Sequence, residues 1–171
     1  MKIVCVAGGS YKSFYLNYVI NLRKCDLLIF NFGILYDYDI YDELMGKGIV
    51  TKELMNLSRR LDTQIVAGIF VKYKNKIEKS IIICNKDKIE LNQISLGAKI
   101  IVKNKTFVIG DESTKTKSNN KIILSSKRLY PNLEHCALNK FYVFLDKFGV
   151  TFIEKRKMTR KFNKYSKFVL K

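Results

Sequence analysis

Residues Cys25–Gly33 read CDLLIFNFG, and this stretch decides the fold class. Its centre is an unbroken apolar run of strand length, which is typical of a strand buried on both faces of a sheet. In an open α/β sheet, ligand chemistry lies just beyond the carboxyl ends of such strands. The run brings Phe32 to that point, where an enzyme would need a carboxylate, a thiol or an imidazole.

In the segments on either side of this strand, the spacing of apolar residues is typical of helices in some and of strands in others. Helices are predicted where apolar residues recur every three or four positions, and strands where short apolar runs are bounded by turn residues. The predicted helices cover Tyr11–Lys24, Thr51–Leu61 and Asn132–Phe148, and the predicted strands cover Lys2–Ala7, Asp26–Phe32, Gln64–Val71, Glu78–Cys84, Lys88–Leu91, Ala98–Lys103, Thr106–Ile109, Lys121–Ser125 and Val150–Ile153. Strands and helices alternate first and hairpins follow, so we predict an α/β fold with a mixed sheet.

The size and composition are those of one globular domain. A chain of 171 residues, of which 47% are hydrophobic, can bury a sizeable core. No apolar stretch reaches the length of a membrane span, and the N-terminal MKIVCVAGG has no cleavable signal pattern. We therefore expect a cytoplasmic protein with one domain over residues 1–154, followed by a basic C-terminal tail over residues 155–171.

The predicted tail is strongly basic in a chain whose net charge is already +17. Its sequence, KRKMTRKFNKYSKFVLK, holds eight basic residues, no acidic residue and interleaved aromatic residues. Such a pattern suits nucleic acid, an anionic membrane surface or an acidic partner, and a solvated tail is the plainer interpretation. The candidate contacts to an anion or to nucleic acid are Lys155, Arg156, Lys157, Arg160, Lys161 and Lys164.

Other residue groups that could carry chemistry favour structural roles. The four cysteines stand at 5, 25, 84 and 136 without CxxC spacing, so we expect buried free thiols, no metal and no cofactor. Cys136 follows His135, the only histidine, but neighbouring helix positions point about 100 degrees apart. The acidic residues Asp37, Asp39, Asp42 and Glu43 fit no EF-hand loop, and the turn at Gly8–Gly9–Ser10 completes no phosphate-binding motif.

The order and spacing of the segments resemble the amino-terminal part of the nitrilase, or carbon–nitrogen hydrolase, superfamily. The second strand of that family typically reads DLIVFPE, and Asp26–Phe32 reads DLLIFNF. A strand of the IV-x-G type matches Ile65–Gly68, while Leu91–Leu96 and Leu124–Asn132 stand where the family has its Tyr-x-Lys-x-x-Leu and ICYD…FPE segments. Over Lys2–Ile153, the resemblance implies a nitrilase-like partial αββα fold: a mixed β-sheet sandwich layer with helices on one face, lacking the second half of the sandwich.

The resemblance also implies which residues occupy the catalytic positions. The family hydrolyses amides or nitriles with a glutamate base, a lysine that stabilises the oxyanion and a cysteine nucleophile. Carried over by position, these places hold Phe32, Gln93 and Ser125, or Ser126 if the gap shifts by one residue. A phenyl ring cannot accept a proton, an amide brings no charge, and a hydroxyl is far less acidic than a thiol. The resemblance thus implies a protein without carbon–nitrogen hydrolase activity, with a binding or assembly role as a homo-oligomer or with a partner protein.

Two alternatives remain open from the sequence. One is an active amidase or nitrilase-type hydrolase with displaced groups, which would use Cys136, or Ser125 together with Lys127. The other is a nucleic-acid-binding module that acts through the basic tail. An assay of amide hydrolysis and a salt titration of binding distinguish them.

Overall fold

The computed structural model describes residues 1–9, 12, 22, 24–34, 48–73, 76–114, 120–132, 136, 140–162 and 165–169. Within these ranges the elements are β1 (Lys2–Val6), β2 (Leu27–Phe30), α2 (Ile49–Leu61), β3 (Gln64–Tyr73), β4 (Lys76–Asn85), β5 (Lys88–Gln93), the 3-10 helix η3 (Ile94–Leu96), β6 (Ala98–Val102), β7 (Lys105–Gly110), β8 (Asn120–Leu124), β9 (Phe141–Asp146), β10 (Gly149–Glu154), β11 (Lys157–Lys161) and β12 (Tyr165–Val169). The predicted helix over Tyr11–Lys24 and the acidic loop lie almost entirely outside the described residues.

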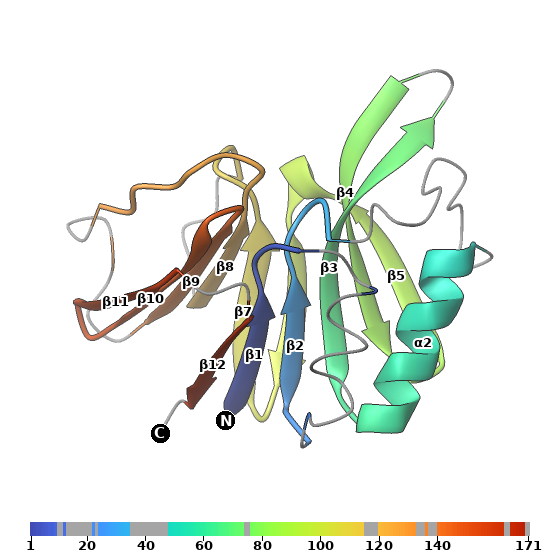
Figure 1. The fold of residues 1–171 in the computed structure, drawn as a ribbon, viewed down its shortest axis with the longest axis horizontal. Helices are drawn as coiled ribbons and strands as arrows, with labels where there is room; N and C mark the ends of the chain where they lie inside the picture. Colours follow the sequence, from blue (N-terminus) through green and yellow to red (C-terminus); the bar gives the residue numbers. More distant parts are fainter. Residues whose placement is uncertain are drawn as a thin grey trace.

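The strands form two six-stranded mixed sheets that face each other (Figure 1). The first sheet has the order β12-β1-β2-β3-β4-β5, and the second has the order β11-β10-β9-β8-β7-β6. The pairs β1–β2, β2–β3, β7–β8 and β8–β9 are parallel, and the remaining pairs are antiparallel. The prediction of a mixed-sheet α/β fold is confirmed. The expected loss of half the sandwich is wrong, because this chain supplies both sheets.

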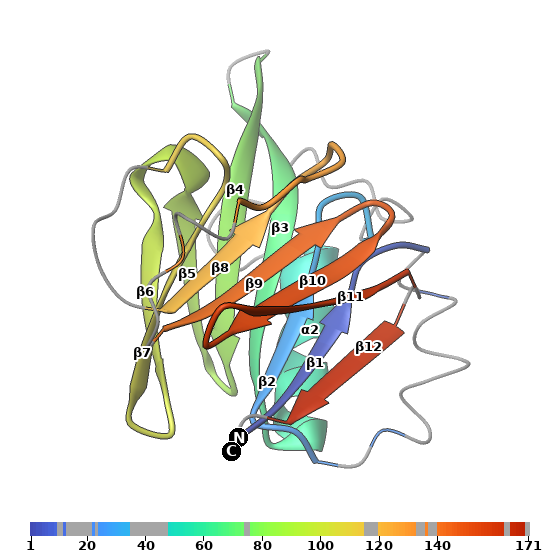
Figure 2. The same ribbon diagram turned by 90° about the vertical axis from the view of Figure 1, so that its left-hand side faces the viewer.

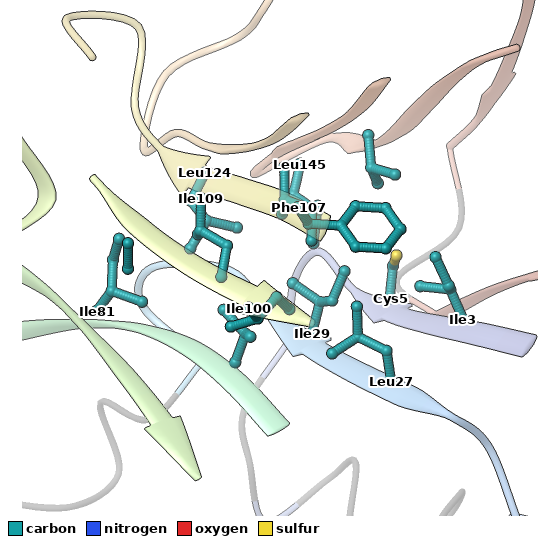
Figure 3. Close-up of a cluster of buried hydrophobic side chains, with 14 of the residues drawn as sticks. Ile3, Cys5, Leu27, Ile29, Ile81, Ile100, Phe107, Ile109, Leu124 and Leu145 are labelled. Atoms are coloured by element: carbon teal, nitrogen blue, oxygen red, sulfur yellow. The ribbon is translucent and has the colours of Figure 1, made fainter. Parts of the chain in front are cut away.

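The opening strand is apolar throughout because it is covered on both faces. Successive side chains point to opposite faces of a strand, so Leu27 and Ile29 enter the core between the sheets. Leu28 and Phe30 point the other way, into a second cluster against α2. Figure 3 shows the core between the sheets, where Leu27 and Ile29 lie with Phe107 of the second sheet. Leu27, Ile29 and Phe107 are fully buried.

Helix α2 covers the outer face of the first sheet (Figure 1). Its apolar residues Leu54, Leu57 and Leu61 recur at helical spacing and are buried against strand residues of that face. On the outer face of the second sheet, the described residues Cys136, Tyr142 and Ile153 form a small cluster, and no helix in the described ranges covers it. The layering is therefore a partial αββα sandwich with a helix on one face.

The helix predicted over Asn132–Phe148 is wrong from Phe141 onward, where β9 and the β9–β10 turn stand. The run FYVFLD is aromatic and β-branched, which favours a half-buried or buried strand. Its apolar residues also satisfy a spacing of three or four, so periodicity alone could not separate the two structures. Gly149 is the first residue of β10, and a Cβ there would clash with the Lys161 carbonyl oxygen.

The residues predicted as a basic tail contribute one edge strand to each sheet. Strand β11 pairs with β10 at the edge of the second sheet, and β12 pairs with β1 at the edge of the first. Charged residues, lysine above all, are common on edge strands because they oppose pairing with another chain. The charge that suggested a solvated tail is thus consistent with two strands at sheet edges.

Candidate functional site

The three positions matched to the family's catalytic residues lie at one end of the sandwich. Phe32 follows β2 and Ser125 follows β8, each at the carboxyl end of a strand in a parallel pair. Gln93 is the last residue of β5. This is the end of the sheets where an α/β protein places its ligand chemistry.

Asn31 joins the ends of β2 and β8 across the two sheets. Its side-chain Nδ2 donates a 2.8 Å hydrogen bond to the Ser125 carbonyl, and its Oδ1 accepts one of 3.2 Å from the Ser125 amide. The Asn31 side chain has no solvent exposure, so these bonds replace all contact with water. Its own amide donates to the Val6 carbonyl, which fixes it to β1.

Replacing Asn31 by alanine is expected to lower the free energy of unfolding by about 2 kcal/mol, because a buried carbonyl at Ser125 loses its partner. Chemical denaturation of the purified variant measures the change. Asn85→Ala, at an exposed asparagine, is the matched control and is expected to stay within about 0.5 kcal/mol of the parent. Equal stabilities of the two variants would contradict a bridging role for Asn31.

Phe32 occupies the place of the family's general base and is part of the core. Its ring is 5% exposed and lies 5.3 Å from the Phe70 ring, centroid to centroid. Gly68 on β3 leaves room for it, because a Cβ there would stand 3.0 Å from the ring. The Lys79 Nζ lies 5.4 Å from the ring centroid. The position holds a packed ring beside a cation.

The Ser125 hydroxyl is buried and engaged in hydrogen bonds. Its Oγ donates to the Glu112 carboxylate and accepts a 3.0 Å hydrogen bond from the Lys127 amide. Ser125 has no solvent exposure, whereas Glu112 is exposed. A carboxylate that accepts from a hydroxyl is the arrangement of a base with its nucleophile, but a substrate carbonyl would need a path to the oxygen.

Gln93 faces solvent at a shallow depression of about 370 Å³. Glu78, Lys79 and Asp111 line the same depression, so it carries both signs of charge. Lys79 connects it to Phe32, and Asp111 is the chain neighbour of the Glu112 that contacts Ser125. Of the three matched positions, only Gln93 lines this depression and reaches the solvent, while Phe32 and Ser125 are buried.

All four cysteines are free and buried, as predicted. Cys136 lies on the outer face of the second sheet with Tyr142 and Ile153. Burial raises the pKa of its thiol, against the opposing effects of the Lys121 and Arg156 charges. A thiol with a raised pKa is a poor nucleophile at neutral pH. His135 lies outside the described residues.

Five of the six basic residues predicted as anion contacts are described, and they lie at the two ends of β11. Lys155 and Arg156 make the β10–β11 turn, and Lys161 ends β11 at its other end. Arg160 is engaged in an ion pair with Asp146, with 2.8 Å between Nη2 and Oδ2. Lys164 is not among the described residues. Since β11 separates Lys155 and Arg156 from Arg160 and Lys161, only an extended ligand would reach both ends.

The described part of the chain lacks both a cluster of metal ligands and a membrane-spanning helix. It contains no group of three histidine, cysteine, aspartate or glutamate residues placed to hold a metal ion. No helix in the described ranges is long and apolar enough to cross a membrane.

Sequence reasoning missed Asn31, Lys79 and Glu112. Asn31 had a visible signal, since a lone amide at the end of an apolar strand must find partners when buried. Lys79 and Glu112 had none, because a lysine in a hairpin strand and a glutamate in a polar loop are ordinary surface residues. Their contacts come from strand pairing and loop placement.

This chain is similar to known proteins in its fold but matches none of them in its sequence. No family model and no curated protein matches the sequence. A CN-hydrolase superfamily protein from Xanthomonas campestris, with an arsenic adduct in its active site, superimposes with a TM-score of 0.70 at 9% identity over 98% of this chain and 89% of that one. A mutant amidase from Nesterenkonia sp. AN1, in complex with butyramide, gives 0.66 at 6% identity, over 98% and 88%. A glutamine-dependent NAD+ synthetase from Acinetobacter baumannii gives 0.57 at 11% identity, over 98% of this chain and 45% of that one.

Proposed function

We propose that this chain, which has the fold of the carbon–nitrogen hydrolase superfamily, does not hydrolyse carbon–nitrogen bonds and serves a binding or assembly role. The observation that carries the proposal is the buried ring of Phe32 at the place of the family's general base. The ring fills the space against Phe70 and Gly68, so no water or substrate amide would fit there without repacking. Without a base, neither a hydroxyl nor a thiol becomes the attacking anion.

The other two matched positions support the same proposal. Ser125 is closed off from solvent, and an attacking atom must come within about 3–3.5 Å of the substrate carbonyl carbon. Gln93 is accessible but uncharged, and a fixed charge or donor pair is what stabilises the oxyanion in acyl transfer. Because members of a catalytic group act together, loss of each of them removes most of the rate advantage.

A second candidate, an active hydrolase with displaced groups, has two specific observations in its favour. The Glu112 carboxylate accepts from the Ser125 hydroxyl, and the Lys79 ammonium group lies in the depression beside Gln93. These could serve as base, nucleophile and oxyanion donor if the site opened. Cys136, the other candidate nucleophile, is disfavoured by its raised thiol pKa.

A panel of simple amides and nitriles, assayed with pure protein, tests the proposal. We expect no turnover above the uncatalysed rate, for the parent or for Ser125→Ala. Turnover that Ser125→Ala abolishes, while the exposed-serine control Ser113→Ala retains it, would overturn the proposal. Turnover lost in Cys136→Ala instead would also overturn it and identify the thiol as the nucleophile.

An assembly role is supported by solvent-exposed apolar side chains on η3 and β6. Leu96 is 77% exposed and Ile101 is 69% exposed, and covering them would remove apolar surface from water. We propose a homo-oligomer or a partner protein as their cover, in the cytoplasm, where four free thiols are stable. Sedimentation of the purified protein as a monomer at all concentrations would contradict self-association.

A further inference from the structure

The loops that follow β8, β9 and β11 lie at one end of the second sheet (Figure 2), and they contain aromatic and cationic residues. We call six of these residues the aromatic–basic surface: Lys127, Arg128, Tyr130, Lys147, Phe148 and Phe162. Three are aromatic and three are cationic. They come from three separate loops, so the fold and not a local run of sequence puts them together.

The three rings of this surface are unusually open to solvent. Tyr130 is 78% exposed, Phe148 is 45% exposed and Phe162 is 65% exposed. Arg128 lies over two of them, with its Cζ 5.2 Å from the Tyr130 centroid and 5.6 Å from that of Phe148. Lys147 lies 4.9 Å from the Phe148 centroid. Tyr130, Arg128, Phe148 and Lys147 therefore form an alternating row of rings and cations.

A buried ion pair beneath the surface holds its three loops together. The Asp146 carboxylate accepts 2.9 Å hydrogen bonds from the Leu129 and Phe148 amides, and it pairs with the Arg160 guanidinium. Arg160 in turn lies over the Phe162 ring at 5.1 Å. These bonds tie the loop after β8, the β9–β10 turn and the end of β11 to one carboxylate, so the surface is preorganised before any ligand arrives.

The cations of the surface are available to an external anion. Within the described residues, the side chains of Lys127, Arg128 and Lys147 make no ion pair. The neighbouring Asp146 is neutralised by Arg160 and leaves little negative potential at the surface. Three cations beside three open rings form a site for a ligand with repeated anions and flat apolar groups.

We propose that the aromatic–basic surface binds single-stranded nucleic acid, with bases stacked on Tyr130, Phe148 and Phe162 and phosphates near Lys127, Arg128 and Lys147. Base stacking on aromatic side chains and arginine planes, beside a basic track for the backbone, is how single strands are held without sequence preference. The inference rests on the binding role proposed above and deepens it by naming the partner.

An anionic membrane would attract the same cations, but the geometry favours a nucleic acid. To enter the apolar layer, the rings would have to take the overlying Arg128 and Lys147 charges with them, which is costly. Stacked bases keep those charges at the surface. The rings also lie beside the cations rather than on an opposite face, unlike an amphipathic membrane anchor.

Binding of the full chain to a labelled oligo-dT at several salt concentrations tests the proposal. The variant Lys127→Gln/Arg128→Gln/Lys147→Gln is expected to reduce the slope of log affinity against log salt by about 2, because each phosphate that a cation neutralises on a single strand adds about 0.7 to that slope. Its control, Lys76→Gln/Lys88→Gln/Lys99→Gln, removes the same charge from exposed lysines on β4, β5 and β6 and is expected to keep most of the slope.

Replacing rings by leucine separates stacking from general hydrophobicity. Tyr130→Leu and Phe162→Leu are each expected to weaken oligo-dT binding about tenfold, because the stacking face is removed while apolar area remains. No binding by the parent at low salt, or an equal loss in the lysine control, would overturn the proposal. The proposal would also be overturned if Tyr130→Leu and Phe162→Leu bound oligo-dT as tightly as the parent and still bound phosphatidylserine vesicles. Amide turnover would overturn the non-hydrolytic proposal and leave these binding outcomes unaffected.

Discussion

Replacement of Phe32 by alanine is expected to lower the free energy of unfolding by about 3–5 kcal/mol. The ring is 5% exposed and fills the space between Phe70 and the backbone of Gly68. Its removal loses the transfer free energy of a phenyl group and leaves a cavity that the surrounding sheet can close only in part. Denaturant titration of the purified variant measures the loss, and Phe148→Ala, at a half-exposed ring, serves as the control with a much smaller effect.

The contact with Gly68 gives this prediction a second test. In the parent, Gly68→Ala is expected to cost about 1–3 kcal/mol, since the added Cβ would lie 3.0 Å from the Phe32 ring. In the Phe32→Ala background the new methyl group enters vacated space, so the two losses should not add. Strict additivity would show that Phe32 does not pack where the structure puts it, and the interpretation of this position as closed would fail with it.

Replacement of Arg160 by methionine is expected to cost about 3 kcal/mol at neutral pH, because it leaves the Asp146 charge buried without its partner. Asp146 is 1% exposed and keeps only the hydrogen bonds from the Leu129 and Phe148 amides. Thermal and denaturant unfolding measure the loss. Arg156→Met removes an exposed arginine from the nearby turn and should change stability by about 0.5 kcal/mol or less.

The pH dependence of unfolding tests whether the unpaired Asp146 charge causes the stability loss in Arg160→Met. Burial by itself raises the pKa of Asp146, but hydrogen bonds from the Leu129 amide, the Arg160 guanidinium and the Phe148 amide outweigh burial and lower the pKa below 3.8. The stability from a lowered pKa is fully present above the unfolded value and is lost as pH falls through the folded value. The difference between the parent and Arg160→Met should therefore shrink at acid pH. A difference that stays constant would point to lost packing instead.

Much of the fold could be predicted from short-range patterns. The strand in Asp26–Phe32, the helix over Thr51–Leu61 and the hairpin strands over Glu78–Cys84 and Lys88–Leu91 were predicted correctly, because each pattern depends on neighbours in the chain. Where the pattern was ambiguous, prediction failed. The aromatic run at Phe141 satisfies both periodicities, and only its pairing with β8 and β10 selects a strand.

The candidate site also has one part that the sequence predicts and one part that it does not. The three matched positions, Phe32, Gln93 and Ser125, could be named from the order of the segments, and the structure brings them to one end of the sandwich. The groups that touch them could not be named. Asn31, Lys79 and Glu112 reach the site through sheet-to-sheet packing and loop placement, over sequence separations that no local rule covers.

The sequence by itself determined the strand within Cys25–Gly33, the helix over Thr51–Leu61 and the residue types at the matched positions, because side-chain chemistry and periodicity are local properties. The tertiary structure alone decided that the last basic residues form two sheet edges and that Tyr130, Phe148 and Phe162 share one surface. It also decided that Phe32 is closed in the core while Gln93 is open. Each of these depends on which distant segments meet, and that is set by burial of both sheet faces rather than by any one segment.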